Sequence, residues 1–232
     1  MDCKLYQKHL IALLALVAAL SLQQPLQAQT NAQWRDSLAV LGRAIAQNPT
    51  SVDLRLRKAA VNLELNQWDY AIEEYGRVLE QDPKNLAAFF FRAYANNQLR
   101  RYDLAIADYD RVLSLVPKHF EALLGGSMAN RKAGNKTRAL DQLNLLVQFF
   151  PDSALAYAAR AGYEAELKMY DAALFDWDEA ILRDSASVDF VVSKVDVLLA
   201  LNRKREARQL LRDLIDRGVP KAALKEWLER SK

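Results

Sequence analysis

The sequence has few of the residue types on which most catalytic and metal sites depend. Its 232 residues include one cysteine, Cys3, and two histidines, His9 and His119. A single cysteine cannot close an intramolecular disulfide, and a metal site would need oxygen ligands alone. No GxGxxG, P-loop, GxSxG or HExxH motif occurs in the sequence. We therefore expect no catalytic residues, no metal and no cofactor, and we predict that the protein is not an enzyme.

The sequence also lacks a strong excess of one charge. It contains 32 Lys and Arg against 29 Asp and Glu, which gives a formal net charge of +3. The two signs are interspersed along the whole chain. Proteins that bind nucleic acids usually concentrate their basic residues on one face or stripe. We therefore expect no nucleic-acid partner.

The one long apolar run lies near the N-terminus and is short for a membrane span. It covers Leu10–Leu22, follows Lys4 and Lys8, and precedes a polar stretch that contains Ala28. At about 1.5 Å per residue the run reaches roughly 20 Å, against about 30 Å for the hydrocarbon core of a bilayer. This order of charged, apolar and small-residue segments predicts a signal peptide over residues 1–28, cleaved after Ala28.

An uncleaved N-terminal anchor is the alternative interpretation of this segment. A lipoprotein is disfavoured because Cys3 precedes the apolar run instead of following it. After cleavage we expect no stable membrane span. We expect an exported protein in the periplasm of a diderm bacterium, with a eukaryotic secretory route as the open alternative.

Four prolines, Pro49, Pro83, Pro117 and Pro151, are spaced 34 residues apart. Proline ends helices, and a fixed period of this length is typical of stacked-repeat proteins. With Pro83 as position 32 of a 34-residue unit, small residues recur in the same register. Position 20 is alanine in five consecutive units: Ala71, Ala105, Ala139, Ala173 and Ala207.

Large side chains recur in this register as well. Positions 17 and 24 are Trp68 and Tyr75 in one unit and Tyr102 and Tyr109 in the next. Small residues at positions 8 and 20 allow two helices to approach closely, and large residues beside them fill the remaining space. The pattern therefore predicts an all-α chain built from helix pairs.

These combined positions resemble the tetratricopeptide repeat (TPR). The segments LNQWDYAIEEYGRVLEQDP and LRRYDLAIADYDRVLSLVP are similar to members of that family almost residue for residue. The resemblance implies a right-handed superhelical solenoid of antiparallel helix pairs. It also implies a concave groove lined mainly by the first helix of each pair, in which a protein or peptide binds.

The register divides the chain into a half repeat, five repeats and a terminal cap. The fifth repeat is degenerate because Ser185 replaces the proline expected before it. The last helix is expected to shield the open end of the array. The predicted boundaries are 1–28 (signal peptide), 29–51 (leading helix), 52–85, 86–119, 120–153, 154–187 and 188–221 (repeats one to five) and 222–232 (capping helix).

We predict a structural role, and not a functional one, for two sets of polar residues. A base at position 7 and an acid at position 23 occur together in repeats one, two and four, which predicts an ion pair between the two helices of a repeat. The pairs are Lys58–Glu74, Arg92–Asp108 and Arg160–Asp176. The asparagines Asn62, Asn96 and Asn130 recur at position 11, which we attribute to duplication of one ancestral repeat in preference to a ladder that grips peptides.

The residue before each first helix is a good N-cap in four repeats. The exception is His119 in repeat three. We interpret it as an exposed residue between repeats in preference to a pH sensor or a catalytic base, because no second histidine or cysteine of the exported chain could share the chemistry.

The groove positions of repeats two and three form the candidate binding site. Apolar residues are expected to form its floor and polar or basic residues its edge, suited to peptide carbonyls or an acidic side chain. Burial of the aromatic residues against a neighbouring helix is an equal alternative. The floor consists of Phe90, Tyr94, Leu124 and Met128, and the edge of Asn97, Gln98, Arg131 and Lys132.

These features predict an exported, non-catalytic scaffold that binds a protein or peptide partner in its groove, as an accessory subunit of an envelope assembly or secretion complex. The alternative is a periplasmic ligand-binding protein for a carbohydrate or a cell-wall fragment, because aromatic side chains also hold sugars. Self-association is a further option, since the fifth repeat provides either a cap or an exposed face.

Overall fold

The computed structural model describes residues 31–232, and the predicted signal peptide with its cleavage site lies outside them. Residues 31–232 form helices and no strands, which confirms the predicted all-α fold class. The chain divides into two compact units, one ending at Pro117 and one beginning at Lys118. In residues 31–232 no helix is long and apolar enough to cross a membrane.

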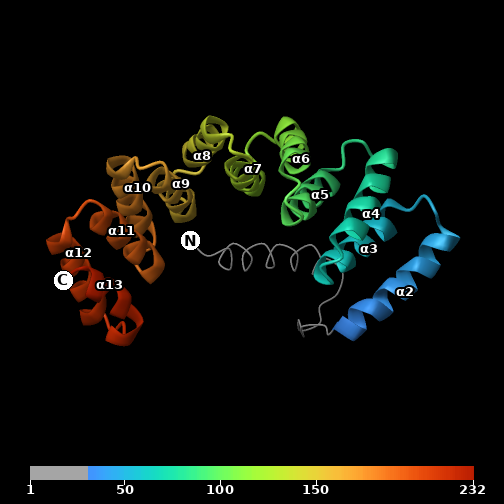
Figure 1. Cartoon of the computed structure of the whole chain (residues 1–232). Helices are drawn as coiled ribbons and strands as arrows, with labels where there is room; N and C mark the ends of the chain where they lie inside the picture. Colours follow the sequence, from blue (N-terminus) through green and yellow to red (C-terminus); the bar gives the residue numbers. More distant parts are fainter. Residues whose placement is uncertain (1–30) are drawn as a thin grey trace. The chain divides into compact units, whose positions relative to one another are not determined.

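The first unit consists of a single helix followed by two helix pairs. The leading helix packs against the first pair, and the helices of each pair pack along one another (Figure 1). The helices are α2 (Asn31–Gln47), α3 (Val52–Glu64), α4 (Trp68–Gln81), α5 (Leu86–Gln98) and α6 (Tyr102–Leu115).

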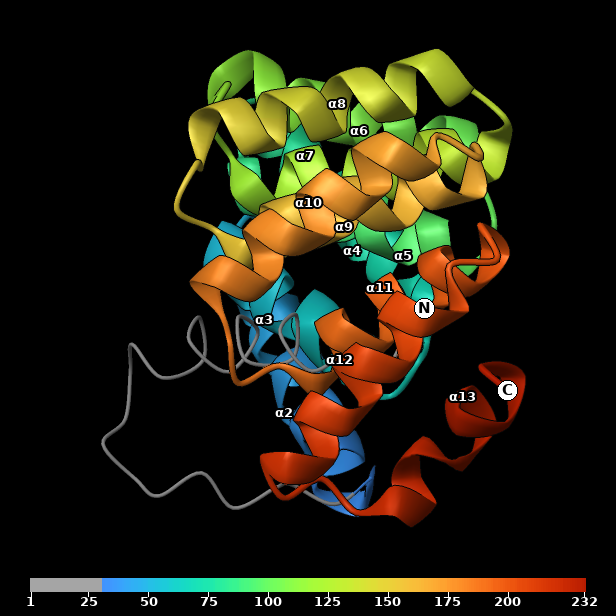
Figure 2. The same ribbon diagram turned by 90° about the vertical axis from the view of Figure 1, so that its left-hand side faces the viewer.

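The second unit consists of three helix pairs and a short terminal segment. The two helices of each pair pack along one another, and Figure 2 shows α9 and α10 side by side. The elements are α7 (Phe120–Ala133), α8 (Lys136–Phe149), α9 (Ala154–Glu166), α10 (Tyr170–Arg183), α11 (Val188–Ala200), α12 (Lys204–Asp216), the 3₁₀ helix η1 (Lys221–Leu224) and α13 (Lys225–Arg230).

Small and large residues alternate inside each pair as the register predicts. Ala93 and Ala105 are buried in the second pair, and Tyr75 and Trp177 are buried at position 24 of the first and fourth. Burial raises the pKa of the Tyr75 hydroxyl well above its ordinary value. The close approach of the two helices therefore depends on alanine, and the space beside the alanine is filled by aromatic rings.

Every first helix in the two units begins with a side-chain cap. Ser51, Asn85, Ser153 and Ser187 each accept a hydrogen bond from the backbone N–H three residues on, as expected. The expectation for His119 was wrong, because its Nδ1 accepts a hydrogen bond from the backbone N–H of Ala122 at 3.3 Å. The imidazole of His119 therefore caps the N-terminus of α7, as a serine or asparagine side chain caps the other first helices.

The first helix of each pair is followed, at position 15, by a residue with positive φ. Glycine occupies this position in repeat three, where Gly134 has φ of 85°. Elsewhere a residue with a side chain adopts the left-handed conformation, which costs free energy for residues other than glycine. These residues are Asn66 (φ 55°), Arg100 (φ 59°), Lys168 (φ 61°) and Asn202 (φ 57°).

The fifth repeat keeps its helix pair although its signature is degenerate. Val195, Ala207 and Leu211 are buried between α11 and α12, as their counterparts are in the other pairs. Arg217 donates a hydrogen bond to the carbonyl of Ser185. Thirty-four residues earlier, Arg183 donates in the same way to the carbonyl of Pro151 at 2.6 Å. The loop contact therefore uses a backbone oxygen, which serine supplies as well as proline.

The C-terminal segment closes the second unit. α13 packs against α11 and α12. The indole Nε1 of Trp227 donates to a carboxylate oxygen of Asp196 at 3.0 Å, and the guanidinium of Arg230 lies 2.7 Å from the same oxygen. Leu224 of η1 is buried. One carboxylate on α11 thus fixes two side chains of the terminal helix.

Candidate protein-binding surface

Four of the predicted site residues lie on α5 in the first unit. Phe90, Tyr94, Asn97 and Gln98 follow one another at spacings of four, three and one residues, which places them along one face of the helix. The face changes character along its length. Its beginning is aromatic and its end carries two amides.

The aromatic end of this face is buried inside the first unit. Phe90 is 3% exposed and Tyr94 is 8% exposed. The ring of Phe90 lies 5.9 Å from the ring of Tyr109, and that of Tyr94 lies 5.9 Å from the ring of Trp68, both edge to face. The observed ring contacts therefore support packing of Phe90 and Tyr94 inside the unit. A direct contact of these rings with a partner stays a prediction.

The amide end of the α5 face is accessible. Gln98 is exposed and Asn97 is half-buried. The side-chain Oδ1 of Asn97 is buried and has no hydrogen-bond partner among the described residues. The amide of Gln98, in contrast, is open to solvent and can both donate and accept hydrogen bonds. This end of the face is therefore suited to hydrogen bonding with a peptide backbone.

The other four predicted residues lie on α7 in the second unit. Leu124 is buried, Met128 and Arg131 are half-buried, and Lys132 is exposed. The guanidinium of Arg131 lies 2.9 Å from a carboxylate oxygen of Glu166 on α9. It also lies 6.0 Å from the centroid of the Tyr163 ring. The basic edge of this unit therefore consists of one paired cation, Arg131, and one exposed cation, Lys132.

The predicted ion pairs between the helices of a repeat are confirmed. All three carboxylates are buried, and the shortest hydrogen bond of each joins it to the cation at position 7 of its repeat. Buried, paired carboxylates of this kind are not available as general acids or bases. The shortest N–O distances are 2.7 Å for Lys58–Glu74, 2.7 Å for Arg92–Asp108 and 2.6 Å for Arg160–Asp176.

Repeat three replaces the ion pair by a network of neutral amides. The Nδ2 of Asn130 donates to Oε1 of Gln142 at 3.0 Å and to the carbonyl of Gly126 at 3.0 Å. A Cβ atom at position 126 would lie 2.8 Å from Nε2 of Gln142, so glycine provides the space for this amide. Asn130 is buried and bonded inside its own repeat, as the structural interpretation of the recurring asparagines expects.

Repeat four contains a buried carboxylate that the sequence analysis did not single out. Glu164 stands at position 11, where the three preceding repeats have asparagine, and it is 6% exposed. Burial, with the negative charge of Asp176 as the next cause, raises the pKa of Glu164 to about 7, although Arg160 opposes the shift. Its Oε2 has no hydrogen-bond partner among residues 31–232. The change from asparagine to an acid was the available signal.

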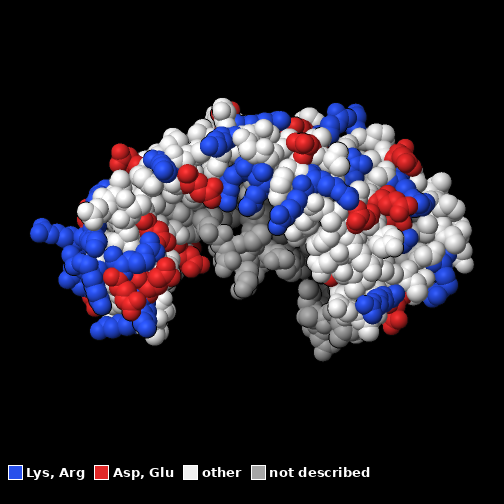
Figure 3. Space-filling view, in the orientation of Figure 1, with Lys and Arg blue, Asp and Glu red and all other residues white. Residues whose placement is uncertain are grey.

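Charge on the outside of the protein is mixed. Figure 3 shows both basic and acidic side chains on the visible face, with neither sign covering it alone. Several of these charges pair with a neighbour on the same helix, such as Arg57 with Asp53 at 2.9 Å. On this face the charges therefore form no continuous basic stripe of the kind that nucleic-acid-binding proteins use (Figure 3).

Family models described as tetratricopeptide repeat match residues 26–90, 61–120 and 98–154. Together these matches cover more than half of the 232-residue chain. The chain therefore belongs to the TPR family of helical-repeat proteins, which mediate interactions between proteins. No curated protein sequence matches the chain significantly.

Solved structures share the fold at low sequence identity. A TPR protein from Parabacteroides merdae is 21% identical with a TM-score of 0.60, over 86% of this chain and 78% of that one. MamA from Desulfovibrio magneticus RS-1 is 16% identical with a TM-score of 0.65, over 71% and 93% of the two chains. YrrB is 18% identical with a TM-score of 0.61, over 76% and 91%.

Proposed function

We propose that the chain is an exported, non-catalytic scaffold that binds a protein or peptide segment along the first helices of its repeats, as an accessory subunit of an envelope assembly or secretion complex. The observation that carries this proposal is the amide end of α5. There, the exposed amide of Gln98 follows the half-buried Asn97. An extended segment supplies N–H and C=O groups that match such side chains.

The second unit supports the same class of partner. Arg131 of the predicted groove lies on α7, and its side chain contacts Glu166 on the next first helix, α9. An acidic side chain of a partner would compete with Glu166 for the guanidinium of Arg131. Lys132 provides a second, exposed cation nearby in sequence. We therefore expect the bound segment to carry at least one acidic residue.

A peptide is the ligand class to test first. YrrB, whose fold is similar, is described as a TPR protein with an unusual peptide-binding site. The two chains are 18% identical, so the location of that site is not transferred. In this chain, the helix faces on α5 and α7 each end in an exposed polar side chain, Gln98 and Lys132.

Site-specific photocrosslinking tests the proposal. A photoreactive side chain replaces Gln98 in one variant and Lys132 in another, and both positions are exposed, so the fold is preserved. The control replaces Arg208, which is exposed on the second helix α12. We expect the same partner to be captured from the first two positions and not from the control. Equal capture from all three positions would contradict the assignment to the first helices.

Export is tested separately. If the signal peptide is cleaved after Ala28, N-terminal sequencing of the protein from its host will begin at Gln29. Fractionation of a diderm host should place that form in the periplasm. Recovery of the chain with Met1 in the cytoplasm would overturn the proposed export and leave the scaffold proposal to the crosslinking result.

A further inference from the structure

A cleft in the first unit is lined by none of the residues of the predicted groove. It has a volume of about 380 Å³ where α2, α3 and α4 meet. Leu38 of α2 lines one side, Asn62 of α3 lines another, and Tyr70 and Glu73 of α4 line a third. Clefts of this size accommodate small ligands or one unit of a chain-like ligand.

One residue of this cleft has an unsatisfied hydrogen-bonding group. Asn62 is 2% exposed, and its Nδ2 has no hydrogen-bond partner among the residues that the structure describes. In repeat three the equivalent asparagine donates to the side chain at position 23. In repeat one position 23 is Glu74, whose Oε1 accepts from Lys58 and whose Oε2 accepts from Arg55. Because both oxygens of Glu74 accept hydrogen bonds from these two cations, Glu74 does not accept one from Asn62, as the side chain at position 23 does in repeat three.

The charges around the cleft cancel. Lys58 is paired with Glu74 at 2.7 Å, and Arg77 is paired with Glu73 within the same helix. The cleft therefore offers a ligand hydrogen-bond donors and acceptors but no net charge. Tyr70, which lines the cleft, is 63% exposed although it carries a large aromatic ring. An exposed aromatic ring beside polar groups is suited to a ligand with one apolar face.

We propose that this cleft binds a neutral saccharide. A sugar hydroxyl both donates and accepts hydrogen bonds, so one ring can accept from the amide of Asn62 and donate to the carboxylate of Glu73. The C–H face of the sugar ring packs on Tyr70. The residues that line this site are different from those proposed to contact the protein partner.

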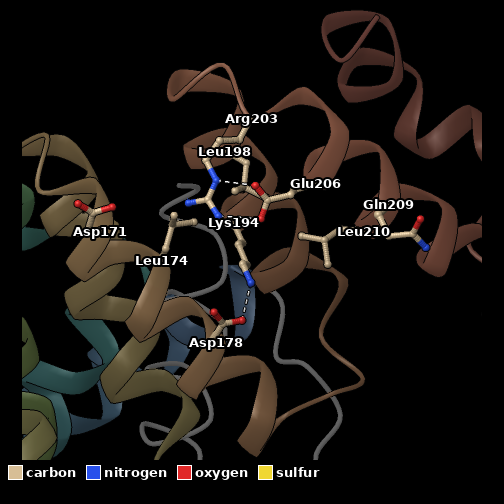
Figure 4. A pocket seen from close by; sticks show the side chains of 9 residues that line it. All are labelled: Asp171, Leu174, Asp178, Lys194, Leu198, Arg203, Glu206, Gln209 and Leu210. Carbon is tan, nitrogen blue, oxygen red and sulfur yellow. Dashed lines mark hydrogen bonds and ion pairs between the residues drawn. The ribbon is translucent and has the colours of Figure 1, made fainter.

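The fifth repeat contains a matched cleft without these groups. It has a volume of about 460 Å³, and Figure 4 shows its lining. Leu198 occupies the register position of Asn62, Leu210 that of Glu74 and Glu206 that of Tyr70. Its charges are also paired, Lys194 with Asp178 and Arg203 with Glu206. This cleft therefore serves as an internal control for the saccharide site.

Isothermal titration calorimetry with defined probes tests the proposal. The probes are neutral gluco-, manno- and chito-oligosaccharides, together with a neutral Ser- and Ala-rich peptide. We expect at least one oligosaccharide to bind, and Asn62→Leu and Tyr70→Ala each to weaken binding by about tenfold or more. Asn62→Leu copies the residue that the protein itself uses at position 198, so the fold is expected to persist.

The control variant is Glu206→Ala in the matched cleft, which should leave saccharide binding unchanged. Circular dichroism establishes that each variant is folded. Absence of binding by every oligosaccharide, or binding that neither Asn62→Leu nor Tyr70→Ala weakens, would overturn the proposal. Binding of the peptide with the same sensitivity to these variants would also overturn it, by assigning the cleft to peptides.

Discussion

Replacing Glu164 by glutamine should make the protein more stable at neutral pH and should remove part of the pH dependence of its stability. Glu164 is buried, and its pKa is raised from 4.5 to about 7, first by burial and next by Asp176. The folded protein therefore favours the protonated acid. Glutamine has the same shape as that neutral form and retains an N–H group that can donate to a carboxylate.

The direction of this pH dependence follows from the linkage between protonation and folding. Because the folded pKa lies above the unfolded one, the contribution of Glu164 to stability is greatest below pH 4.5 and is lost as the pH rises through 7. A pKa difference of one unit corresponds to about 1.4 kcal/mol. The free energy of unfolding of Glu164→Gln relative to the wild type should therefore increase by about 2 to 3 kcal/mol between pH 5 and pH 8.

Urea unfolding followed by far-ultraviolet circular dichroism, repeated at intervals from pH 5 to pH 8, measures this difference. Subtracting the wild type removes the contribution of all other titrating groups. The control is Glu80→Gln, because Glu80 is exposed on α4. The control difference should not change with pH. If the difference for Glu164→Gln were equally flat, the raised pKa and its attribution to burial would both be refuted.

Three other substitutions probe the packing of the repeats, each by urea unfolding. Arg92→Leu and Asp108→Leu should each cost about 3 to 5 kcal/mol, but together they should cost less than the sum, by a coupling energy of about 1 to 3 kcal/mol; strict additivity would contradict the ion pair. Lys168→Gly should stabilise by up to about 1 kcal/mol, because φ of Lys168 is 61°. Ala105→Leu should destabilise by about 1 to 3 kcal/mol, whereas Ala107→Leu on the exposed side of the same helix should change little.

The fold was predictable because its signals repeat. Proline, alanine and aromatic residues each recur at fixed positions of a 34-residue period, four times for proline and five times for the alanine at position 20, so the register is clear even where one copy departs from it. Ser185 shows that a departure from the pattern does not by itself indicate a change in structure. The loss of proline suggested a weakened repeat, yet Arg217 contacts a backbone oxygen there, and a backbone oxygen does not depend on residue type.

The site was predictable only in part, because family geometry gives the direction of a side chain and not what packs against it. Phe90 and Tyr94 lie on the expected helix face, but edge-to-face contacts with other rings bury them. Conversely, no pattern indicated that the amide of Asn62 would lack an acceptor. That depends on two cations, Arg55 and Lys58, reaching the same carboxylate. Competition between neighbours for one group is a property of three-dimensional distances.

The repeats also show which residues the fold requires and which it tolerates. Position 20 is alanine in all five pairs and is buried each time, so close approach of the helices is a common requirement. Positions 11 and 23 instead vary from asparagine and acid to Leu198 and Leu210 in the fifth pair. Since an apolar pair there supports the same helix hairpin, the polar pairs of other repeats are not needed for folding. Replacing both Arg92 and Asp108 by leucine should for the same reason cost less than the two single changes added together, because each single change leaves one charge without its partner.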